Sequence, residues 1–258
     1  MGIVYKAEDT KLKRTVALKF LPQHLTSTEE ERVRFVQEAQ AVAALNHPNI
    51  CTVHAIEESE GKQFIAMEFV DGKTLRDKVM AIHELPLQDV FTYAVQIGEA
   101  LQEAHSKGIV HRDIKAENIM VNSKSQIKVM DFGLAKLKGS LKLTRTSSTV
   151  GTLAYMAPEQ IQGGEVDARA DIFSFGAVLF EMLTARLPFR GEHEAAMMYS
   201  IVNEPPESLV KQRPDVPPDL ERIVYRALEK EPEDRYQSVA DMVSELRRIK
   251  KQTSRVSR

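Results

Sequence analysis

Two short motifs constrain the fold and the chemistry of this 258-residue chain more than any other feature. Residues 111–118 read His-Arg-Asp-Ile-Lys-Ala-Glu-Asn, and residues 131–133 read Asp-Phe-Gly. Either motif alone is compatible with an ordinary turn or a salt-bridged loop. Together they combine Asp113, a carboxylate that can accept a proton, with two side chains that offer hard oxygen ligands.

The residues between the two motifs predict how those side chains meet. Residues 119–121 and 127–129 are short apolar runs typical of strands, and the polar residues 122–126 are typical of a turn. An antiparallel hairpin places the start of its first strand beside the end of its second. We therefore expect Asn118 and Asp131 to become neighbours at the open end of a hairpin.

On these motifs the chain resembles the catalytic domain of protein kinases, and most closely the bacterial eukaryotic-like serine/threonine kinases. The likeness extends from about residue 2 to about residue 249. It implies a two-lobed α+β fold, with a small antiparallel β lobe that lacks its first strand and contains one helix, and a larger, mainly helical lobe. As a single protein kinase domain, 1–258, the chain divides into an N-lobe (1–67), a hinge (68–72), a C-lobe (73–249) and a basic tail (250–258).

The resemblance implies transfer of the γ-phosphate of Mg·ATP to serine or threonine hydroxyls of proteins. Asp113 would be the base, and Lys115 would neutralise the moving phosphoryl group. Tyrosine-specific relatives lack a lysine at the position of Lys115. Asn118 and Asp131 would bind Mg²⁺, with Mn²⁺ as an alternative ion. Ala116 replaces a common proline, a change that should matter little because this side chain does no chemistry.

A lysine and a glutamate are expected to form an ion pair that positions the nucleotide. Residues 16–19 form an apolar run that ends in Lys19, which would hold the α- and β-phosphates. Residues 28–45 begin with a capping-box pattern and continue with helical apolar spacing. Glu38 lies on the apolar stripe of that helix, where a carboxylate is costly unless it is paired. Lys19 is the expected partner, in a contact that the family forms and breaks as a switch.

The nucleotide site follows from the same resemblance. Residues 63–72 form an apolar strand that ends in Asp-Gly, and they would supply the hinge; a plain core strand is the competing interpretation. The residues predicted to contact the nucleotide are Gly2, Val4, Ala17, Lys19, Met67, Glu68, Val70, Met120 and Asp131. A packed column between the lobes would contain Val42, Val53, His111 and Phe132, with His111 in a packing role.

Residues 133–159 resemble a kinase activation segment, with hydroxyl side chains followed by a peptide-docking block at 151–159. Thr152 would bond near Asp113 and Lys115, and Glu159 would pair with Arg235. Arg112 is a cation that phosphate on a nearby threonine could satisfy. We therefore expect Thr144 and Thr146 to be activating autophosphorylation sites, with a homodimer as the arrangement for phosphorylation in trans.

One segment predicts the centre of the large lobe. Residues 171–184 are apolar on nearly every side, which is typical of a fully buried helix. Asp171 at its start should fix the backbone around His111 and Arg112. Gly176 should permit close packing of a neighbouring helix.

Composition agrees with this interpretation. A net charge of −2 gives no reason to expect a nucleic-acid partner. The one cysteine, Cys51, excludes an intrachain disulfide and suits a reducing cytoplasm. No apolar run has transmembrane length, so we expect a cytoplasmic domain, although a longer parent protein could be anchored in a membrane.

The beginning of the sequence departs from the family. Residues 1–7 match only the last glycine of the kinase Gly-rich loop and the strand after it, so we expect a fragment or a start at an internal methionine. Nucleotide binding should then be weaker. The alternative function is a silent kinase-fold binding or scaffold module. It is disfavoured because Lys19, Asp113, Lys115, Asn118 and Asp131 are all present.

Overall fold

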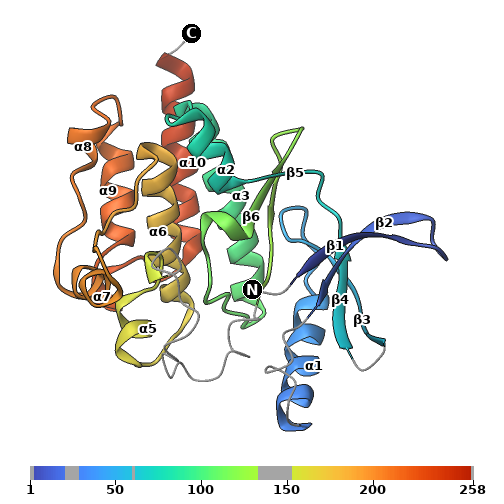
Figure 1. The fold of residues 1–258 in the computed structure, drawn as a ribbon. Helices are drawn as coiled ribbons and strands as arrows, with labels where there is room; N and C mark the ends of the chain where they lie inside the picture. Colours follow the sequence, from blue (N-terminus) through green and yellow to red (C-terminus); the bar gives the residue numbers. More distant parts are fainter. Residues whose placement is uncertain (1–2, 21–28, 60–61, 133–152, 257–258) are drawn as a thin grey trace.

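The computed structural model describes residues 3–20, 29–59, 62–132 and 153–256. Within these ranges, the side chains of several residues at 29–38, of Lys62 and of 254–256 are not described. Figure 1 shows two bodies, one built mainly of strands and one of helices, with a hairpin between them. This arrangement is the predicted two-lobed α+β fold.

The smaller body is an antiparallel sheet packed against one helix. Its strands are β1 (Val4–Asp9), β2 (Arg14–Phe20), β3 (Val53–Ser59) and β4 (Lys62–Glu68), in the order β1-β2-β4-β3. Helix α1 (Glu29–Ala43) lies against the sheet, as Figure 1 shows. A small apolar cluster fills the space between them: Ala17, Ala39, Cys51, Ile65 and Met67.

The predicted hairpin is confirmed, and a third short strand extends it. Strands β6 (Ile119–Asn122) and β7 (Ile127–Val129) pair antiparallel, with β5 (Gly72–Thr74) added beside β6. An isolated bridge between Ile50 and Val129 ties this hairpin to the segment that precedes β3. The hairpin is therefore fixed to both bodies. It can give rigid support to a site that lies between them.

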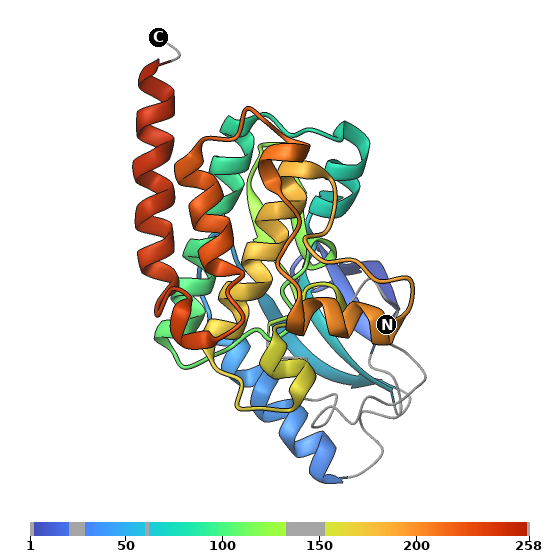
Figure 2. The same cartoon turned by 90° about the vertical axis from the view of Figure 1, so that its left-hand side faces the viewer.

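The larger body is helical, and its remaining elements are these: α2 (Leu75–Ile82), α3 (Leu87–Ser106), η2 (Ala116–Asn118), α5 (Pro158–Gln162), α6 (Ala168–Thr184), α7 (Glu194–Asn203), α8 (Leu209–Gln212), α9 (Pro218–Ala227), η4 (Pro232–Asp234) and α10 (Val239–Val256). In Figure 2, α10 runs along one side of this bundle and ends near the C-terminus. The connection between α7 and α9 contains the short helix α8, which buries Leu209.

Helix α6 is the predicted central helix, and it begins slightly earlier than the apolar run indicates. Asp167 caps its first turn by accepting a hydrogen bond from the backbone N–H of Arg169 at 2.8 Å. Every side chain from Ala170 to Leu183 is buried. A Cβ at Gly176 would lie 2.8 Å from the Cβ of Ala227, so only glycine allows α9 to approach this closely.

The division into residues 1–67, 68–72 and 73–249 within one domain remains a prediction, although β4 ends at Glu68 and β5 begins at Gly72. Across the described residues, no helix combines the length and apolar character that crossing a membrane requires.

Candidate active site

Asp113, Lys115 and Asn118 lie together in the loop between α3 and β6. The Nζ of Lys115 lies 3.1 Å from each carboxylate oxygen of Asp113. The Nδ2 of Asn118 donates to the backbone carbonyl of Asp113 at 2.8 Å and to its Oδ2 at 3.3 Å. Lys115 is 5% exposed, so this charge is largely shielded from water. The contacts hold one carboxylate in a fixed orientation beside one cation.

Helix α6 anchors this loop, as predicted. The buried carboxylate of Asp171 accepts hydrogen bonds from the backbone N–H of His111 at 2.8 Å and of Arg112 at 2.7 Å. The Nε2 of His105 lies 2.8 Å from Oδ2 of the same carboxylate. A buried carboxylate that accepts several hydrogen bonds satisfies its own charge while it fixes the loop.

His111 packs rather than reacts, in agreement with the sequence interpretation. Its ring is fully buried, and its centroid lies 4.5 Å from that of Phe132. Its Nε2 donates to the backbone carbonyl of Met130 at 2.8 Å, and its Nδ1 accepts from the N–H of Asp113 at 3.2 Å. The ring therefore links the loop of Asp113 to the segment that carries Asp131.

Two residues of this region adopt the left-handed backbone conformation. Arg112 has a φ of 67° and Asp131 a φ of 60°, values that are uncommon for residues other than glycine. Such strain persists where surrounding contacts hold it, and it concentrates at functional sites. Here the bonds to Asp171 hold the backbone at Arg112, and the hydrogen bond from Met130 N–H to Asn118 carbonyl, 2.8 Å, holds the segment before Asp131.

Lys19 forms an ion pair with Asp131 through the Oδ2 of the carboxylate. The sequence did not reveal this contact, because it joins β2 to a segment more than 100 positions away. Glu38, the predicted partner of Lys19, belongs to α1, but its side chain lies outside the described part of the structure. The Lys19–Glu38 pair therefore stays a prediction.

Strand register places several predicted nucleotide contacts on one face of the sheet. Ala17 pairs with Met67, and Val4 pairs with Lys19. Directly opposed residues of antiparallel strands point to the same face, and so do residues two apart along a strand. These four side chains consequently share a face. Val4 is 56% exposed, so it is available for contact.

The remaining predicted contacts come from the hinge and the hairpin. Glu68 ends β4, and its side chain pairs with Lys128 at 2.8 Å. Among the described residues, no backbone hydrogen bond uses the N–H or carbonyl of Val70, which leaves both groups available. Met120 lies on β6 opposite Thr74. Gly2 lies outside the described residues.

A small apolar cavity of about 20 Å³ lies between α1, the sheet and the segment at Asp131. Its lining includes Val42, Cys51, Met67 and Phe132. Burial raises the pKa of the Cys51 thiol to about 12, so this cysteine is protonated and unreactive at neutral pH. The cavity holds about one water molecule and no more.

Asn118 and Asp131 fit a magnesium ion that is shared with phosphates. Hydrogen bonds to Asp113 use the Nδ2 of Asn118, which leaves its carbonyl oxygen for a hard cation. Asp131 uses Oδ2 for Lys19, and its Oδ1 accepts no hydrogen bond from a described residue. No group of three or more His, Cys, Asp or Glu within the described ranges could hold a metal. Protein sites commonly bind magnesium through one or two carboxylates plus substrate phosphates.

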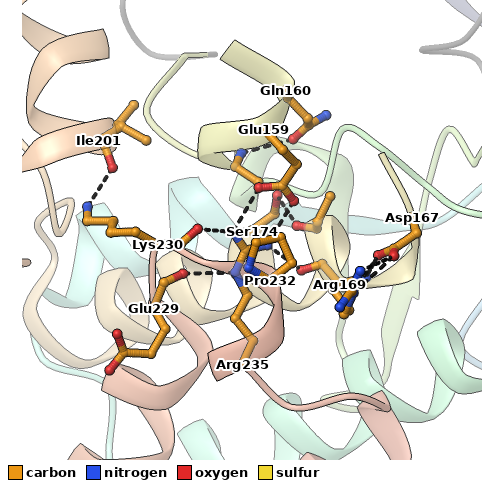
Figure 3. Close-up of polar contacts among 12 residues, drawn as sticks. Glu159, Gln160, Asp167, Arg169, Ser174, Ile201, Glu229, Lys230, Pro232 and Arg235 are labelled. Atoms are coloured by element: carbon orange, nitrogen blue, oxygen red, sulfur yellow. Dashed lines mark hydrogen bonds and ion pairs between the residues drawn. The ribbon is translucent and has the colours of Figure 1, made fainter. Parts of the chain in front are cut away.

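The Glu159–Arg235 pair lies where the sequence places it, and Figure 3 shows it at the centre of a polar network. Both carboxylate oxygens of Glu159 accept from the guanidinium, each at 2.8 Å. Arg235 also donates to the backbone carbonyls of Arg169, Glu229 and Lys230. This network fixes the end of the segment at 153–159 to the large body.

Of the predicted regulatory residues, only Arg112 is described. Its side chain is half-buried, and no hydrogen bond or ion pair joins its guanidinium to another described residue. Its backbone carbonyl accepts from Nε2 of Gln160 at 3.0 Å, a contact that sequence reasoning missed. Thr144, Thr146 and Thr152 lie outside the described residues.

A second contact network escaped the sequence analysis. Asn49, just before β3, donates to Oε1 of Gln96 at 2.8 Å and to the carbonyl of Ile127 at 2.9 Å. The two amides tie α3, the hairpin and the connection to the sheet together. Nothing in the local sequence signals this, because the three segments are far apart in the chain.

Comparison with known proteins agrees with the geometry. The family model described as protein kinase domain matches residues 1–246. The serine/threonine-protein kinase PknB of Mycobacterium leprae is 40% identical over 254 residues, which are 96% of this chain and 41% of that protein. A probable serine/threonine-protein kinase of Streptomyces coelicolor is 41% identical over 94% of this chain and 37% of its own length.

Solved structures show the same fold. The Mycobacterium tuberculosis PknI kinase domain superposes with a TM-score of 0.76 at 28% identity, covering 96% of this chain and 91% of that one. Rad53 1–466 in complex with AMP-PNP superposes with a TM-score of 0.79 at 26% identity, covering 95% and 61%. The chain spans about two fifths of the length of the curated relatives it matches. It belongs to the protein kinase domain family, among the bacterial eukaryotic-like serine/threonine kinases.

Proposed function

We propose that this chain is a serine/threonine protein kinase that transfers the γ-phosphate of Mg·ATP to protein hydroxyls. The observation that carries the proposal is the arrangement of Asp113, Lys115 and Asn118 beside the Lys19–Asp131 pair. Every relative reported above is named a kinase, which favours catalysis over the alternative of a silent scaffold.

Each residue then has a distinct role. Bound Mg·ATP would supply the phosphoryl group and the charge neutralisation of its leaving oxygen. Asp113 accepts the proton of the attacking hydroxyl, and Lys115 lies where negative charge develops. Asn118 and Asp131 would hold the magnesium ion, with Mn²⁺ as a substitute. Lys19, which pairs with Asp131 in this structure, would bind the phosphates, with Glu38 as its proposed partner on α1.

The adenine ring would lie against the sheet face that carries Val4, Ala17 and Met67, and against Met120 from the hairpin. The backbone of Glu68 and Val70 would bond its edge. The Cys51 Sγ lies 3.6 Å from the Glu68 carbonyl, a weak contact that leaves the second lone pair of that oxygen available.

Regulation is proposed at the same loop. Arg112 would bind phosphate on Thr144 or Thr146, because a phosphoryl group brings up to two negative charges and strong acceptors to a guanidinium. Thr152 would bond near Asp113 and Lys115. Phosphorylation in trans would require a transient homodimer.

Intact mass after incubation with Mg·ATP tests the proposal. We expect added phosphate in the parent chain, mapped to Thr144 or Thr146, and none in Asp131→Asn, which loses a magnesium ligand. Rates that rise with protein concentration would support the trans reaction. A parent chain that gains no mass and phosphorylates no added protein would contradict the proposed activity.

We also place the domain in the cytoplasm, where ATP and a reduced Cys51 thiol are expected. Cell fractionation of the natural full-length protein tests this, with protease protection to show on which side of any membrane the domain lies.

A further inference from the structure

Arg76 contacts three other segments of the large body, one of which is the loop that carries the proposed base, Asp113. Arg76 lies in the first turn of α2. Its Nη1 donates to Oε1 of Glu181 on α6 at 2.7 Å and to the hydroxyl of Tyr155 at 3.3 Å. Its Nε lies 3.7 Å from Oε1 of Glu117, in η2 of the catalytic loop. The Tyr155 hydroxyl donates to Oε2 of Glu181 at 2.5 Å, which closes the network.

The network has a buried end and an open end. The side chain of Glu181 is 1% exposed, and Tyr155 is buried. The side chains of Arg76 and Glu117 are each about one third exposed, so they form the rim. Burial raises the pKa values of both Glu181 and Tyr155. We call these four residues the Arg76 pocket.

Charge in the Arg76 pocket is unbalanced. Two carboxylates, Glu117 and Glu181, face one guanidinium. The Oε2 of Glu117 is buried, and no donor from a described residue reaches it. A buried carboxylate oxygen without a donor is costly, so this pocket attracts cationic hydrogen-bond donors. Arg76 fills that role from within the chain.

The pocket adjoins the two segments that would handle a peptide under the proposed function. Glu117 lies in the same loop as Asp113, and the loop backbone at Arg112 bonds to Gln160. Tyr155 belongs to the segment before α5, and its backbone carbonyl accepts from the Ser174 hydroxyl at 2.7 Å. Side chains that join these segments set the distance between the loop of Asp113 and the segment before α5.

We propose that Arg76 is a positioning residue for peptide substrates. It acts as a resident cation that occupies an acidic pocket beside the catalytic loop and so keeps basic substrate side chains out of that pocket. The inference rests on the proposed kinase function. Its physical basis is that a planar guanidinium satisfies two carboxylates and a hydroxyl at once, which a lysine ammonium at the same position reproduces less well.

The experiment compares Arg76→Ala and Arg76→Lys with the parent chain. The assay uses serine peptides in which arginine is fixed at each position in turn. We expect Arg76→Ala to raise the peptide KM by about tenfold with little change in the KM for ATP, because the base and the docking segment lose their fixed spacing. At one peptide position, arginine should become favoured in this variant and not in the parent.

Small cations distinguish this role from general structural support. Methylguanidinium at about 10 mM should lower the peptide KM of Arg76→Ala and raise its Tm, because it refills the vacated pocket. Methylammonium at the same concentration should do neither. Arg76→Lys should keep its fold with an intermediate KM and no response to methylguanidinium. Arg222→Ala is the matched control, since Arg222 pairs only with exposed or half-exposed carboxylates among the described residues.

Two results would overturn the inference. One is an Arg76→Ala variant with an unchanged peptide KM and no new arginine preference; the other is an equal response to the two cations. The Tm measurement needs no catalysis, so it separates this inference from the proposed function. If the parent chain were inactive while methylguanidinium still stabilised Arg76→Ala, the pocket would be supported and the kinase activity contradicted.

Discussion

At the scale of single residues, the site depends on side chains whose partners are fixed by short contacts. Asp113 is held by Lys115 and Asn118, and the backbone beside it is held by Asp171. The side chain of Asp113 can therefore be changed without removing the bonds by which Asp171 holds the loop backbone.

Asp113→Asn should lower kcat by roughly two to four orders of magnitude, because it removes a general base. The amide keeps the size of the side chain, so the unfolding curve in urea should change little. Asp219→Asn, an exposed carboxylate on α9, is the control and should retain full activity. Normal turnover of Asp113→Asn would show that the base is misassigned.

The environment of Lys230 predicts how the free energy of unfolding depends on pH. Its Nζ lies 3.8 Å from the ring centroid of Phe189 and donates to the carbonyl of Ile201 at 2.5 Å, a bond drawn in Figure 3. Burial, with Arg235 nearby, lowers the pKa of Lys230 from 10.5 to about 8. Between these two pH values the unfolded chain binds the proton and the folded chain does not, so this residue makes the free energy of unfolding rise with pH.

Lys230→Met should abolish that contribution. Urea unfolding of the parent and the variant at pH 7.5 to 10.5 should therefore show a stability difference that changes in favour of the parent as pH rises. The comparison cancels the titration of all other groups. A difference that stays constant over this range would mean that the pKa of Lys230 is not lowered by folding.

At the scale of secondary-structure elements, buried polar pairs determine how helices are joined. Glu159 lies in the first turn of α5, and Arg235 directly follows η4. The guanidinium of Arg235 is fully buried. Helix α6 contributes the carbonyl of Arg169 to the same arginine. The segment at 153–159 is thereby attached to helix α6.

Glu159→Ala should lower the free energy of unfolding by about 3 kcal/mol, because it leaves a buried guanidinium without its counter-ion. Three backbone carbonyls remain bonded to Arg235 and limit the loss. Glu233→Ala removes a carboxylate that is 71% exposed and should cost less than about 1 kcal/mol. Equal losses in the two variants, measured in urea, would contradict a special role for the buried pair.

At the scale of the whole molecule, the proposed nucleotide site takes its residues from both bodies. Lys19 comes from the sheet, and Asp131 follows the hairpin, yet they form one ion pair. The ring contact between His111 and Phe132 also links the loop of Asp113 to the segment of Asp131. Val53 packs against the same core that contains Val42 and Phe132. A ligand that bridges these parts should stabilise the entire fold.

An unhydrolysable ATP analogue with Mg²⁺, at about 100 times its Kd, should add about 2.7 kcal/mol to the free energy of unfolding. Most of this gain should disappear when EDTA removes the metal, and also in Asp131→Asn. Thermal unfolding followed by circular dichroism provides the measurement. Equal stabilisation with and without Mg²⁺ would argue against Asn118 and Asp131 as metal ligands.

The sequence by itself determined the family and the two-body architecture, and it supplied the site residues that remain predictions. The hairpin between Asn118 and Asp131, the buried helix near 171–184 and the Glu159–Arg235 pair were all predictable. Local patterns suffice for the first two, because turn residues and apolar periodicity act over a few neighbours. The pair was predictable only from the resemblance, since no local rule joins residues so far apart.

Apart from the Glu159–Arg235 pair, only the tertiary structure decided which distant side chains meet. It placed Lys19 against Asp131, Gln160 on the backbone of Arg112, and Arg76 between Glu117 and Glu181. These contacts depend on how helices and strands pack against one another, and packing direction is not encoded in the few residues around each partner. Burial makes such contacts important for stability, because a charge that is removed from water is costly unless the fold places an opposite charge beside it.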